Sequence, residues 1–234
     1  MDTSSDTLTL VSHCPASKAA DLLGDKWTLM ILRAMLMGAT RYSDFTAAIP
    51  RISPSVLSGR LRQLGDNGLI LRKGGGGQQA SYHLTASGRE TKPLIFLLAR
   101  WGLKWAERNF RTETLDVGGA MWDLHRSLLV QELPDGETVI SITLKEQDQH
   151  NRWWIIAEDN CVDLCNHDPG KDVDIYIHAP LDSLIAVWAG QCSLESAVSE
   201  ETITITGDAH LMRTASLWFP ASPVLLEDRA LAQG

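Results

Sequence analysis

The sequence lacks the features that would place it in several common protein classes. It has no run of about 18 apolar residues, the length that a membrane-spanning helix needs, so we expect no membrane contact. Its first residues have neither the basic start nor the apolar core of a signal peptide, which predicts a cytoplasmic protein. The irregular spacing of its cysteines predicts no disulfide framework: Cys14, Cys161, Cys165 and Cys192.

Patterns of catalytic and cofactor-binding sites are missing as well. No serine, histidine and aspartate are arranged as in a catalytic triad, and no Gly-x-Gly-x-x-Gly motif occurs. The glycines at 74–77 lack the lysine and the strand-to-helix setting that a phosphate loop requires. The sequence therefore predicts no catalytic residues, no bound cofactor and a protein that is not an enzyme.

Cys161, Cys165 and His167 resemble a group of metal ligands. On a strand that rises ~3.3 Å per residue, the two cysteines would lie about 13 Å apart, too far for a disulfide or for one zinc ion. A turn would shorten that distance, but Val162 and Leu164 alternate as in a strand. We predict no metal site, and we expect the other spaced histidines at the surface or at helix caps: His125, His150, His178 and His210.

Charge is distributed unevenly along the chain, whose 234 residues are enough for two domains. Residues 1–111 contain 15 Lys and Arg against 8 Asp and Glu, a net charge of +7. Residues 112–234 contain 6 against 21, a net charge of −15, and the two values give the formal net charge of −8. We expect contact with a polyanion to be confined to the first half. Two domains with arbitrary surface charge are the alternative.

Helical spacing of apolar residues dominates the first 111 residues. Serine, proline and glycine mark the ends of the expected helices: 16–23, 27–37, 43–49, 53–67 and 85–110. The last of these starts at Thr85 or Ser87. Two short strands precede this last helix, Leu69–Lys73 and Ser81–Leu84, with four glycines and two glutamines between them. Helix, turn, helix and β-hairpin in this order predict a winged helix-turn-helix domain over residues 1–111.

The helix over 53–67 has the two faces of a DNA recognition helix. Leu57, Leu61 and Leu64 share the face that should pack inward. Small hydroxyls and a glycine on the other face permit close approach to base edges, and an arginine there can reach a guanine or a phosphate. The predicted DNA-binding residues are those of this face and the basic residues around it: Arg41, Arg51, Ser53, Ser55, Ser58, Gly59, Arg62, Arg72 and Lys73. Arg60 adds a further positive charge to this surface. An ordinary solvated helix and hairpin is the alternative.

The sequence resembles the HxlR family of bacterial winged-helix regulators, relatives of the MarR type, over about residues 13–110. The resemblance lies in CPASKAADLLGDKWTLMILRAMLMGATRYSDF, IPRISPSVLSGRLRQLGDNGLI, YHLTASGRE and LLARWGLKW. It implies a homodimer, built by the first helix and the helix over 85–110, on a pseudo-palindromic operator in double-stranded DNA. The residues agree, since Leu97, Trp101 and Trp105 form an apolar stripe too large for a lone surface helix. The acidic half is an alternative cover for that stripe.

Cys14 precedes Pro15 at the start of the first helix. In several HxlR-like regulators the equivalent cysteine senses oxidants or electrophiles by forming a disulfide, so the resemblance implies a candidate redox sensor. A thiol at a helix N-terminus and near Lys18 is expected to be more reactive than an isolated one. An inert cysteine in a dimer interface is the alternative.

After residue 111 the pattern changes to strands with helices between the later ones. The expected helices are 120–132, 181–189, 194–199 and 210–218, and the expected strands are 138–144, 152–157, 162–165, 173–178 and 202–206. The fold class is therefore α+β, an N-terminal winged helix-turn-helix domain followed by a small α/β sandwich-like domain over residues 120–220. Residues 221–234 are expected to form a loose tail.

The segment DVDIYIHAPLDSLIAVWAGQCSLESAVSEETITITGDAHLMR resembles the sterol carrier protein type two fold. The resemblance covers about residues 120–220 and implies a hydrophobic tunnel that holds a fatty acyl chain or a similar apolar molecule. The candidate ligand-binding residues are Trp154, Ile156, Leu184, Trp188, Leu211 and Trp218. The alternative is that these side chains fill the core.

Two functions follow from these features. The first is a homodimeric transcriptional regulator that binds operator DNA and is modulated by an apolar ligand or by thiol oxidation. The second is a lipid-binding or carrier protein whose winged helix serves only dimerisation. The basic residues around the helix over 53–67 favour the first.

Overall fold

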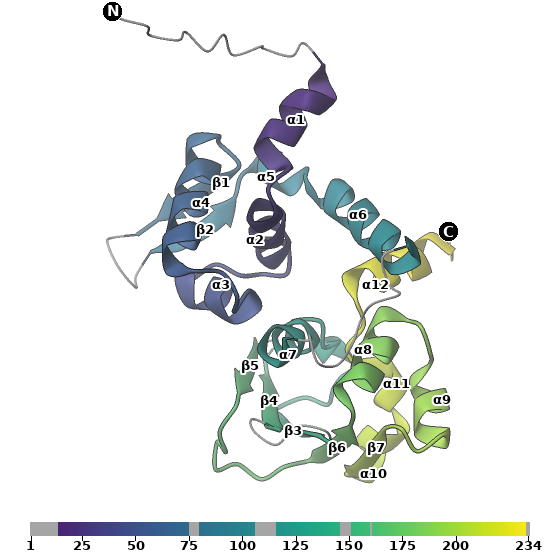
Figure 1. Cartoon of the computed structure of the whole chain (residues 1–234). Coiled ribbons are helices and arrows are strands. Elements are labelled where there is room, and N and C mark those ends of the chain that lie inside the picture. The colour runs from purple at the N-terminus through teal and green to yellow at the C-terminus, as the bar shows by residue number, and fades with distance from the viewer. Residues whose placement is uncertain (1–13, 75–79, 106–115, 146–150, 160, 233–234) are drawn as a thin grey trace, which may run out of the picture.

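The computed structural model describes residues 14–74, 80–105, 116–145, 151–159 and 161–232, apart from the side chains of Leu103 and of residues 228–232. An N-terminal part made mostly of helices is followed by a C-terminal part built on a sheet (Figure 1). This arrangement confirms the α+β fold class. Within the described ranges, no helix combines the length and the apolar character needed to cross a membrane.

The N-terminal part has the helices and the hairpin that the sequence predicted. Its first four helices are α1 (Pro15–Leu23), α2 (Lys26–Leu36), α3 (Tyr42–Ala48) and α4 (Pro54–Asp66). The carboxylate of Asp25 begins α2 by accepting hydrogen bonds from the backbone N–H groups of Trp27 and Thr28, at 2.9 and 3.1 Å. Strands β1 (Ile70–Lys73) and β2 (Ser81–Leu84) pair antiparallel and form the wing.

The long helix predicted over 85–110 is divided into two helices. α5 (Ala86–Arg89) ends before Pro93, and α6 (Lys92–Trp105) begins beside it. Proline has no backbone N–H, and its ring would clash with the carbonyl group four residues earlier, that of Arg89. The prediction of one continuous helix was therefore wrong, and residues 106–110 lie outside the described part of the chain.

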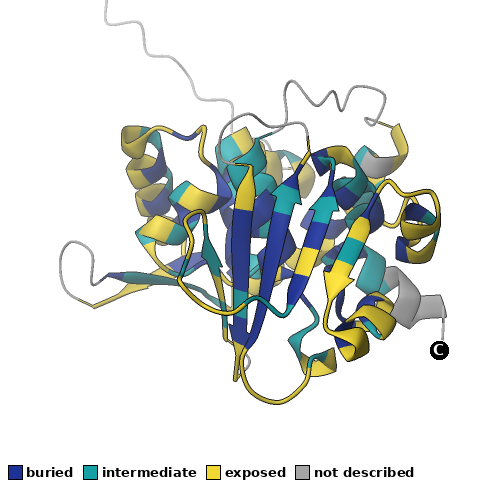
Figure 2. Ribbon diagram, turned by 90° about the horizontal axis from the view of Figure 1, so that it is seen from below, coloured by how far each residue is buried: buried dark blue, intermediate teal, exposed yellow. Residues whose placement is uncertain are grey.

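The C-terminal part contains a five-stranded sheet in the order β5-β4-β3-β6-β7. Its strands are β3 (Thr138–Leu144), β4 (Arg152–Glu158), β5 (Cys161–Cys165), β6 (Ile175–Ala179) and β7 (Thr204–Gly207). β3 pairs in parallel with β6, and the other described pairs of this sheet are antiparallel. In Figure 2 the strands face the viewer with helices behind them, so one face of the sheet carries the helical layer.

The helical layer and the sheet enclose a core whose residues come from nearly every element of the C-terminal part. Its helices are α7 (Val117–Arg126), α8 (Leu181–Ala189), α9 (Leu194–Ser199), α10 (Ala209–Arg213) and α11 (Ala215–Trp218), with a 3-10 turn η4 (Val130–Glu132). The helices predicted over 120–132 and 210–218 are thus each interrupted. Trp218 is fully buried at the centre of this core.

The prediction of a loose tail was wrong for residues 223–232. Residues 223–232 form helix α12 (Pro223–Ala232), which packs against the N-terminal part. Val224 is buried in the N-terminal core, and the carboxylate of Glu227 accepts a hydrogen bond from the Arg100 guanidinium of α6 at 3.1 Å. Because these partners lie more than one hundred residues away along the chain, local patterning gave no sign of them.

Candidate nucleic-acid interface

Helix α4 separates its anchoring residues from its exposed ones. Leu57, Leu61 and Leu64 are 0%, 3% and 2% exposed and hold the helix on the N-terminal core. The residues of α4 and its N-cap predicted to contact DNA are all exposed: Ser53, Ser55, Ser58, Gly59 and Arg62. A Cβ atom added at Gly59 would meet no atom within 4 Å, so the protein leaves this side of the helix open to a close neighbour.

The wing brings a second group of predicted residues beside α4. Arg72 of β1 pairs across the hairpin with Tyr82 of β2. Arg72, Tyr82, Ser58 and Arg62 line the same hollow between α4 and the wing, which has a volume of about 420 Å³. Asp66 also lines this hollow and adds a negative charge. The sequence did not single out Tyr82, because its place opposite Arg72 depends on the strand register.

Three further predicted residues lie exposed at the borders of this surface. Arg41 precedes α3 and forms a β-bridge with Ser81 of the wing, and Arg51 lies in the turn between α3 and α4. Lys73 ends β1, where Gly74 adopts a φ of +87° that turns the chain towards the wing tip. The remaining glycines of the predicted tip, 75–77, lie outside the described residues.

Arg60 has a structural partner, which the sequence did not predict. Its guanidinium donates to Oδ2 of Asp25 at 2.9 Å and to Oε1 of Gln63 at 2.7 Å. Since Asp25 is also the N-cap of α2, this ion pair ties the middle of α4 to the start of α2. The charge of Arg60 is therefore partly neutralised within the protein.

Helix α6 exposes a stripe of large apolar side chains. The exposed fractions are 53% for Leu94, 58% for Leu97, 50% for Leu98, 60% for Trp101 and 63% for Trp105. The acidic C-terminal part therefore does not cover the apolar stripe that the sequence predicted. Leu22 of α1, the other helix that the resemblance assigns to a dimer, is 39% exposed.

The predicted cysteine sites are also placed by the structure. Cys14 is exposed and is the N-cap residue of α1, where its carbonyl oxygen accepts a hydrogen bond from the N–H of Lys18 at 3.1 Å. Cys161 and Cys165 are the first and last residues of strand β5, which confirms the strand between them.

The residues predicted to line a tunnel do not share one cavity. Leu184 and Trp218 lie between sheet and helices beside a remaining space of about 10 Å³, and Leu211 packs in the same core. A cavity of about 150 Å³ is needed to hold a molecule the size of benzene. The space beside Leu184 and Trp218 is thus too small for such a molecule.

The other three predicted ligand residues lie elsewhere. Trp153 of β4 belongs to the core under the helices. Because side chains alternate along a strand, Trp154 and Ile156 point to the opposite face of the sheet. Trp188 is at the edge of the helical layer, where its indole Nε1 donates to Oγ of Ser127 at 2.8 Å.

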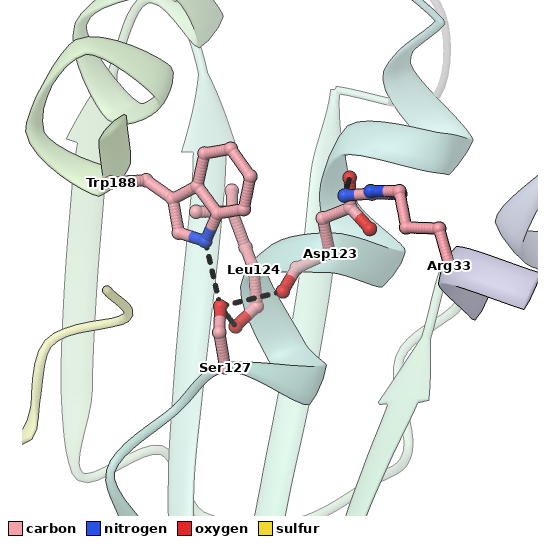
Figure 3. A network of polar contacts seen from close by, with 5 residues as sticks. All are labelled: Arg33, Asp123, Leu124, Ser127 and Trp188. Carbon is pink, nitrogen blue, oxygen red and sulfur yellow. Dashed lines mark hydrogen bonds and ion pairs between the residues drawn. The ribbon is translucent and has the colours of Figure 1, made fainter. Parts of the chain in front are cut away.

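Polar contacts join the N-terminal and C-terminal parts near Trp188 (Figure 3). Nη2 of Arg33, on α2, donates to Oδ2 of Asp123, on α7, at 2.6 Å. The hydroxyl of Ser127 donates to the carbonyl oxygen of Asp123 at 2.7 Å while it accepts from Trp188. Burial raises the pKa of Asp123, and the positive charge of Arg33 acts against this rise. Nε of Arg126 adds a hydrogen bond of 2.9 Å to the carbonyl oxygen of Met37.

His125 lies next to this network and not at the surface or at a helix cap, so that prediction was wrong. Its side chain is 6% exposed, and its ring meets the Trp122 ring edge to face at a centroid distance of 5.6 Å. Burial, together with the positive charge of Arg126, lowers the pKa of His125 to about 4. The imidazole is therefore neutral at pH 7.

Two family models match the chain, one in each half. The HxlR-like helix-turn-helix model matches residues 22–110, and the SCP-2 sterol transfer family model matches residues 131–216. These matches confirm both resemblances.

Relatives and solved structures match the first half. An uncharacterized HTH-type transcriptional regulator of Synechocystis sp. is 35% identical over 97 residues, which cover 41% of this chain and 72% of that protein. The uncharacterized HTH-type transcriptional regulator YvaP of Bacillus subtilis is 32% identical over 100 residues, which cover 42% of this chain and 93% of YvaP. The reduced form of the transcriptional regulator YodB from B. subtilis is 27% identical, and the match covers 42% of this chain and 99% of YodB with a TM-score of 0.36.

The matched region contains α2 to α6, and with them the exposed face of α4 and the wing. The named relatives are regulators, and each is covered by this chain over most of its own length. The chain therefore belongs to the HxlR-like helix-turn-helix family of transcriptional regulators and carries an SCP-2 domain in its second half.

Proposed function

We propose that the protein is a transcriptional regulator without enzymatic activity that binds double-stranded operator DNA as a homodimer. In this proposal residues 1–111 bind DNA and dimerise, and residues 120–220 form the second domain. The observation that carries it is the exposed face of α4, on which small and basic side chains stand beside the wing while buried leucines anchor the helix.

Each part of this surface has a distinct task on DNA. Ser53 and Ser55, whose Oγ atoms are 3.2 Å apart, stand at the N-terminus of α4, where free N–H groups and the helix dipole favour a phosphate. Gly59 lets the helix approach base edges, and Arg62 reaches a guanine or a phosphate. Arg72, on the wing side of the hollow, contacts the sugar-phosphate backbone.

The exposed stripe of α6 supports a second copy of the chain as its cover. Trp101 and Trp105 are large apolar side chains of the kind that anchor protein interfaces, and each is at least 60% exposed. A two-fold dimer presents two α4 helices, which fits a pseudo-palindromic operator.

The alternative function, a carrier whose winged helix serves only dimerisation, has less support. A carrier needs an internal space for its apolar cargo, and the helix–sheet interior leaves about 10 Å³. The basic, open surface of α4 would also have no role in a carrier.

Selection of duplexes from a random pool, followed by fluorescence anisotropy on the enriched sequence, tests the DNA-binding proposal. We expect a pseudo-palindromic sequence whose affinity falls by about 10³ or more between 50 and 200 mM salt, as counterions return to the phosphates. Arg62→Ala should weaken binding by about 10-fold to 100-fold, because one direct base contact contributes ~1–3 kcal/mol.

Arg213→Ala is the matched control, because Arg213 is an exposed arginine on α10 of the acidic half. It should leave the affinity unchanged. A protein that enriches no sequence and shows no salt dependence would contradict the regulator proposal.

Thiol oxidation is proposed as a second input through Cys14. Its exposure at the start of α1, beside a helix assigned to the dimer, supports this role. Diamide treatment should weaken DNA binding by the wild-type protein and leave Cys14→Ser unaffected. An equal response of both proteins would overturn the sensor role.

A further inference from the structure

We propose that a small, neutral, apolar molecule binds between the two parts of the protein, in a pocket bounded by α2, α6, α8 and the start of α12. The pocket has a volume of about 210 Å³. This inference deepens the proposed function. It rests on that function only in naming the pocket as the site of an effector. We call it the interdomain pocket below.

The N-terminal part supplies one wall of the interdomain pocket. Leu36 and Met37, from the end of α2, lie beside residues of α6 that recur at helical spacing, Ile95, Ala99 and Gly102. A Cβ atom added at Gly102 would meet no atom within 4 Å, which agrees with open space on this side of α6. Apart from Arg33 of α2, the side chains of this wall are apolar.

The C-terminal part supplies the opposite wall through Trp188, Ser222 and Val224. The indole N–H of Trp188 is already bonded to Ser127, so the ring offers the pocket an apolar surface (Figure 3). The backbone N–H and the Oγ of Ser222 are each bonded within the protein. Its N–H donates to the Trp188 carbonyl at 2.8 Å, and its Oγ accepts from the N–H of Leu225 at 3.2 Å.

The charge in the lining is compensated before any ligand arrives. Arg33 borders the interdomain pocket, and its guanidinium donates to Asp123 at 2.6 Å. A charged ligand would lose its hydration without gaining an unpaired partner on this wall, whereas a neutral molecule loses little. The lining therefore favours a neutral ligand.

The volume limits the size of that ligand. Since a cavity of about 150 Å³ holds benzene, about 210 Å³ accommodates a bicyclic ring or one ring with a short alkyl chain. A sterol or a long acyl chain is much larger than this space. The effector thus differs from the cargo that the SCP-2 family match would suggest.

The interdomain pocket lies where a ligand could influence DNA binding. Ile95, Ala99 and Gly102 occupy one side of α6, and the exposed Leu98 and Trp101 occupy a neighbouring side. A ligand that holds α6 against α8 therefore acts on the helix that we assign to the dimer. The ligand changes DNA binding because it binds more tightly to one position of α6 than to another.

Isothermal titration of the full-length protein with indole, a neutral bicyclic molecule, tests the site. We expect binding with a Kd on the order of 10–100 µM, the range for a ligand of this size. Gly102→Leu should weaken it at least about 10-fold, because the new side chain fills the pocket and leucine favours the helix more than glycine. Ala99→Phe, which fills the same space, is the second variant if the first fails to fold.

Gly65→Leu is the matched control for indole binding, because Gly65 is a helical glycine of α4 whose added Cβ also meets nothing within 4 Å. It should bind indole as the wild type does. Undiminished binding by a folded Gly102→Leu or Ala99→Phe protein, or no indole binding by the wild type, would overturn the proposal.

Measurements of indole binding and of DNA binding by the wild type separate this proposal from the proposed function. Indole at saturating concentration should change the DNA affinity of the wild type at least about 5-fold, the lower end of typical couplings. DNA binding without any indole binding removes the interdomain pocket and leaves the regulator. Pocket-dependent indole binding without DNA binding removes the regulator and leaves the pocket, and unchanged DNA affinity removes the effector role.

Discussion

The two halves of the chain use their large apolar side chains in different ways. In the described N-terminal half, five of the exposed ones gather on the single helix α6: Leu94, Leu97, Leu98, Trp101 and Trp105. In the C-terminal half the exposed ones are scattered over β6, α9, α10 and α11: Tyr176, Val198, Met212 and Leu217. The N-terminal half also carries +7 and the C-terminal half −15. The first half thus gathers its exposed large apolar side chains on one helix, whereas the second distributes them over several elements.

Packing does not follow the border between basic and acidic halves. Trp122 of α7 and Val224 of α12 lie in the core of the N-terminal half, and the ion pair of Arg33 with Asp123 crosses the same border. The two halves therefore differ in surface chemistry while sharing part of their interior. Four experiments test how far this difference and this sharing extend.

Removal of a central ring tests the shared interior with the largest expected effect. Trp218→Ala in the C-terminal core and Phe45→Ala in the N-terminal core each remove a side chain that is 0% exposed. Each should lower the free energy of unfolding by about 3–5 kcal/mol. Because the halves share core residues, we expect a single unfolding transition in urea whose midpoint falls in both variants. Circular dichroism and tryptophan fluorescence measure this transition. A two-step curve would show that the halves unfold separately.

Titration of His125 tests the closed interior of the C-terminal half. The unfolded imidazole takes up a proton below its ordinary pKa of 6.5, whereas the folded one does so only near its pKa of about 4. Protonation therefore favours the unfolded state as the pH falls between these values, and the loss should reach about 3 kcal/mol. The raised pKa of Asp123 acts in the opposite direction, because the folded carboxyl binds its proton first.

Comparison with His125→Phe isolates the histidine, since phenylalanine keeps the aromatic contact with Trp122 and does not titrate. Urea unfolding of both proteins at a series of pH values from 7 to 4 measures the difference. Equal slopes for the two proteins would mean that His125 is not held neutral by burial.

Loss of the ion pair between the halves should have a smaller effect. Asp123→Asn leaves the partly buried guanidinium of Arg33 without its negative partner and should cost about 1–3 kcal/mol. Asp135→Asn, at an exposed aspartate of the same half, should change the free energy of unfolding by less than about 0.5 kcal/mol. If both variants unfold alike, the ion pair does not hold the halves together.

Two equivalent helix caps, one in each half, give the comparison with the smallest expected effect on stability. Ser53 caps α4 through the N–H of Val56 at 3.4 Å, and Ser193 caps α9 through the N–H of Ser196 at 3.0 Å. Substitution of either serine by alanine should lower the free energy of unfolding by about 1 kcal/mol. Only Ser53→Ala should also weaken DNA binding, measured by anisotropy. Equal DNA affinities of the two variants would argue against α4 as the recognition helix.

Local chemistry made much of the fold predictable. Ser53 with Pro54 marked the start of α4, and the spacing of Leu57, Leu61 and Leu64 gave its buried face. Alternation of the apolar residues Ile140, Ile142 and Leu144 placed β3, and Gly190, which has a φ of +77°, marked the end of α8. These signals depend on neighbours within a few residues, so they survive in the sequence.

Other features depend on which distant residues meet. Pro93 lies within the long apolar pattern that predicted one helix over 85–110, whereas in the structure α5 ends before it. Trp188 was predicted to line an internal tunnel, and the structure places it against α2, α6 and α12 in the interdomain pocket. These three helices are separate elements, and periodicity within one element does not specify which of them meet.

The sequence by itself determined the winged helix-turn-helix, the faces of α4, the α+β class and the opposite charges of the two halves. These follow from hydrophobic periodicity, helix caps and composition, which act over short distances. Only the tertiary structure decided that little space remains beside Leu184 and Trp218, that α12 packs against the first half and that a pocket lies between the halves. Close packing is the physical reason, because the space left between side chains depends on how all the elements fit together.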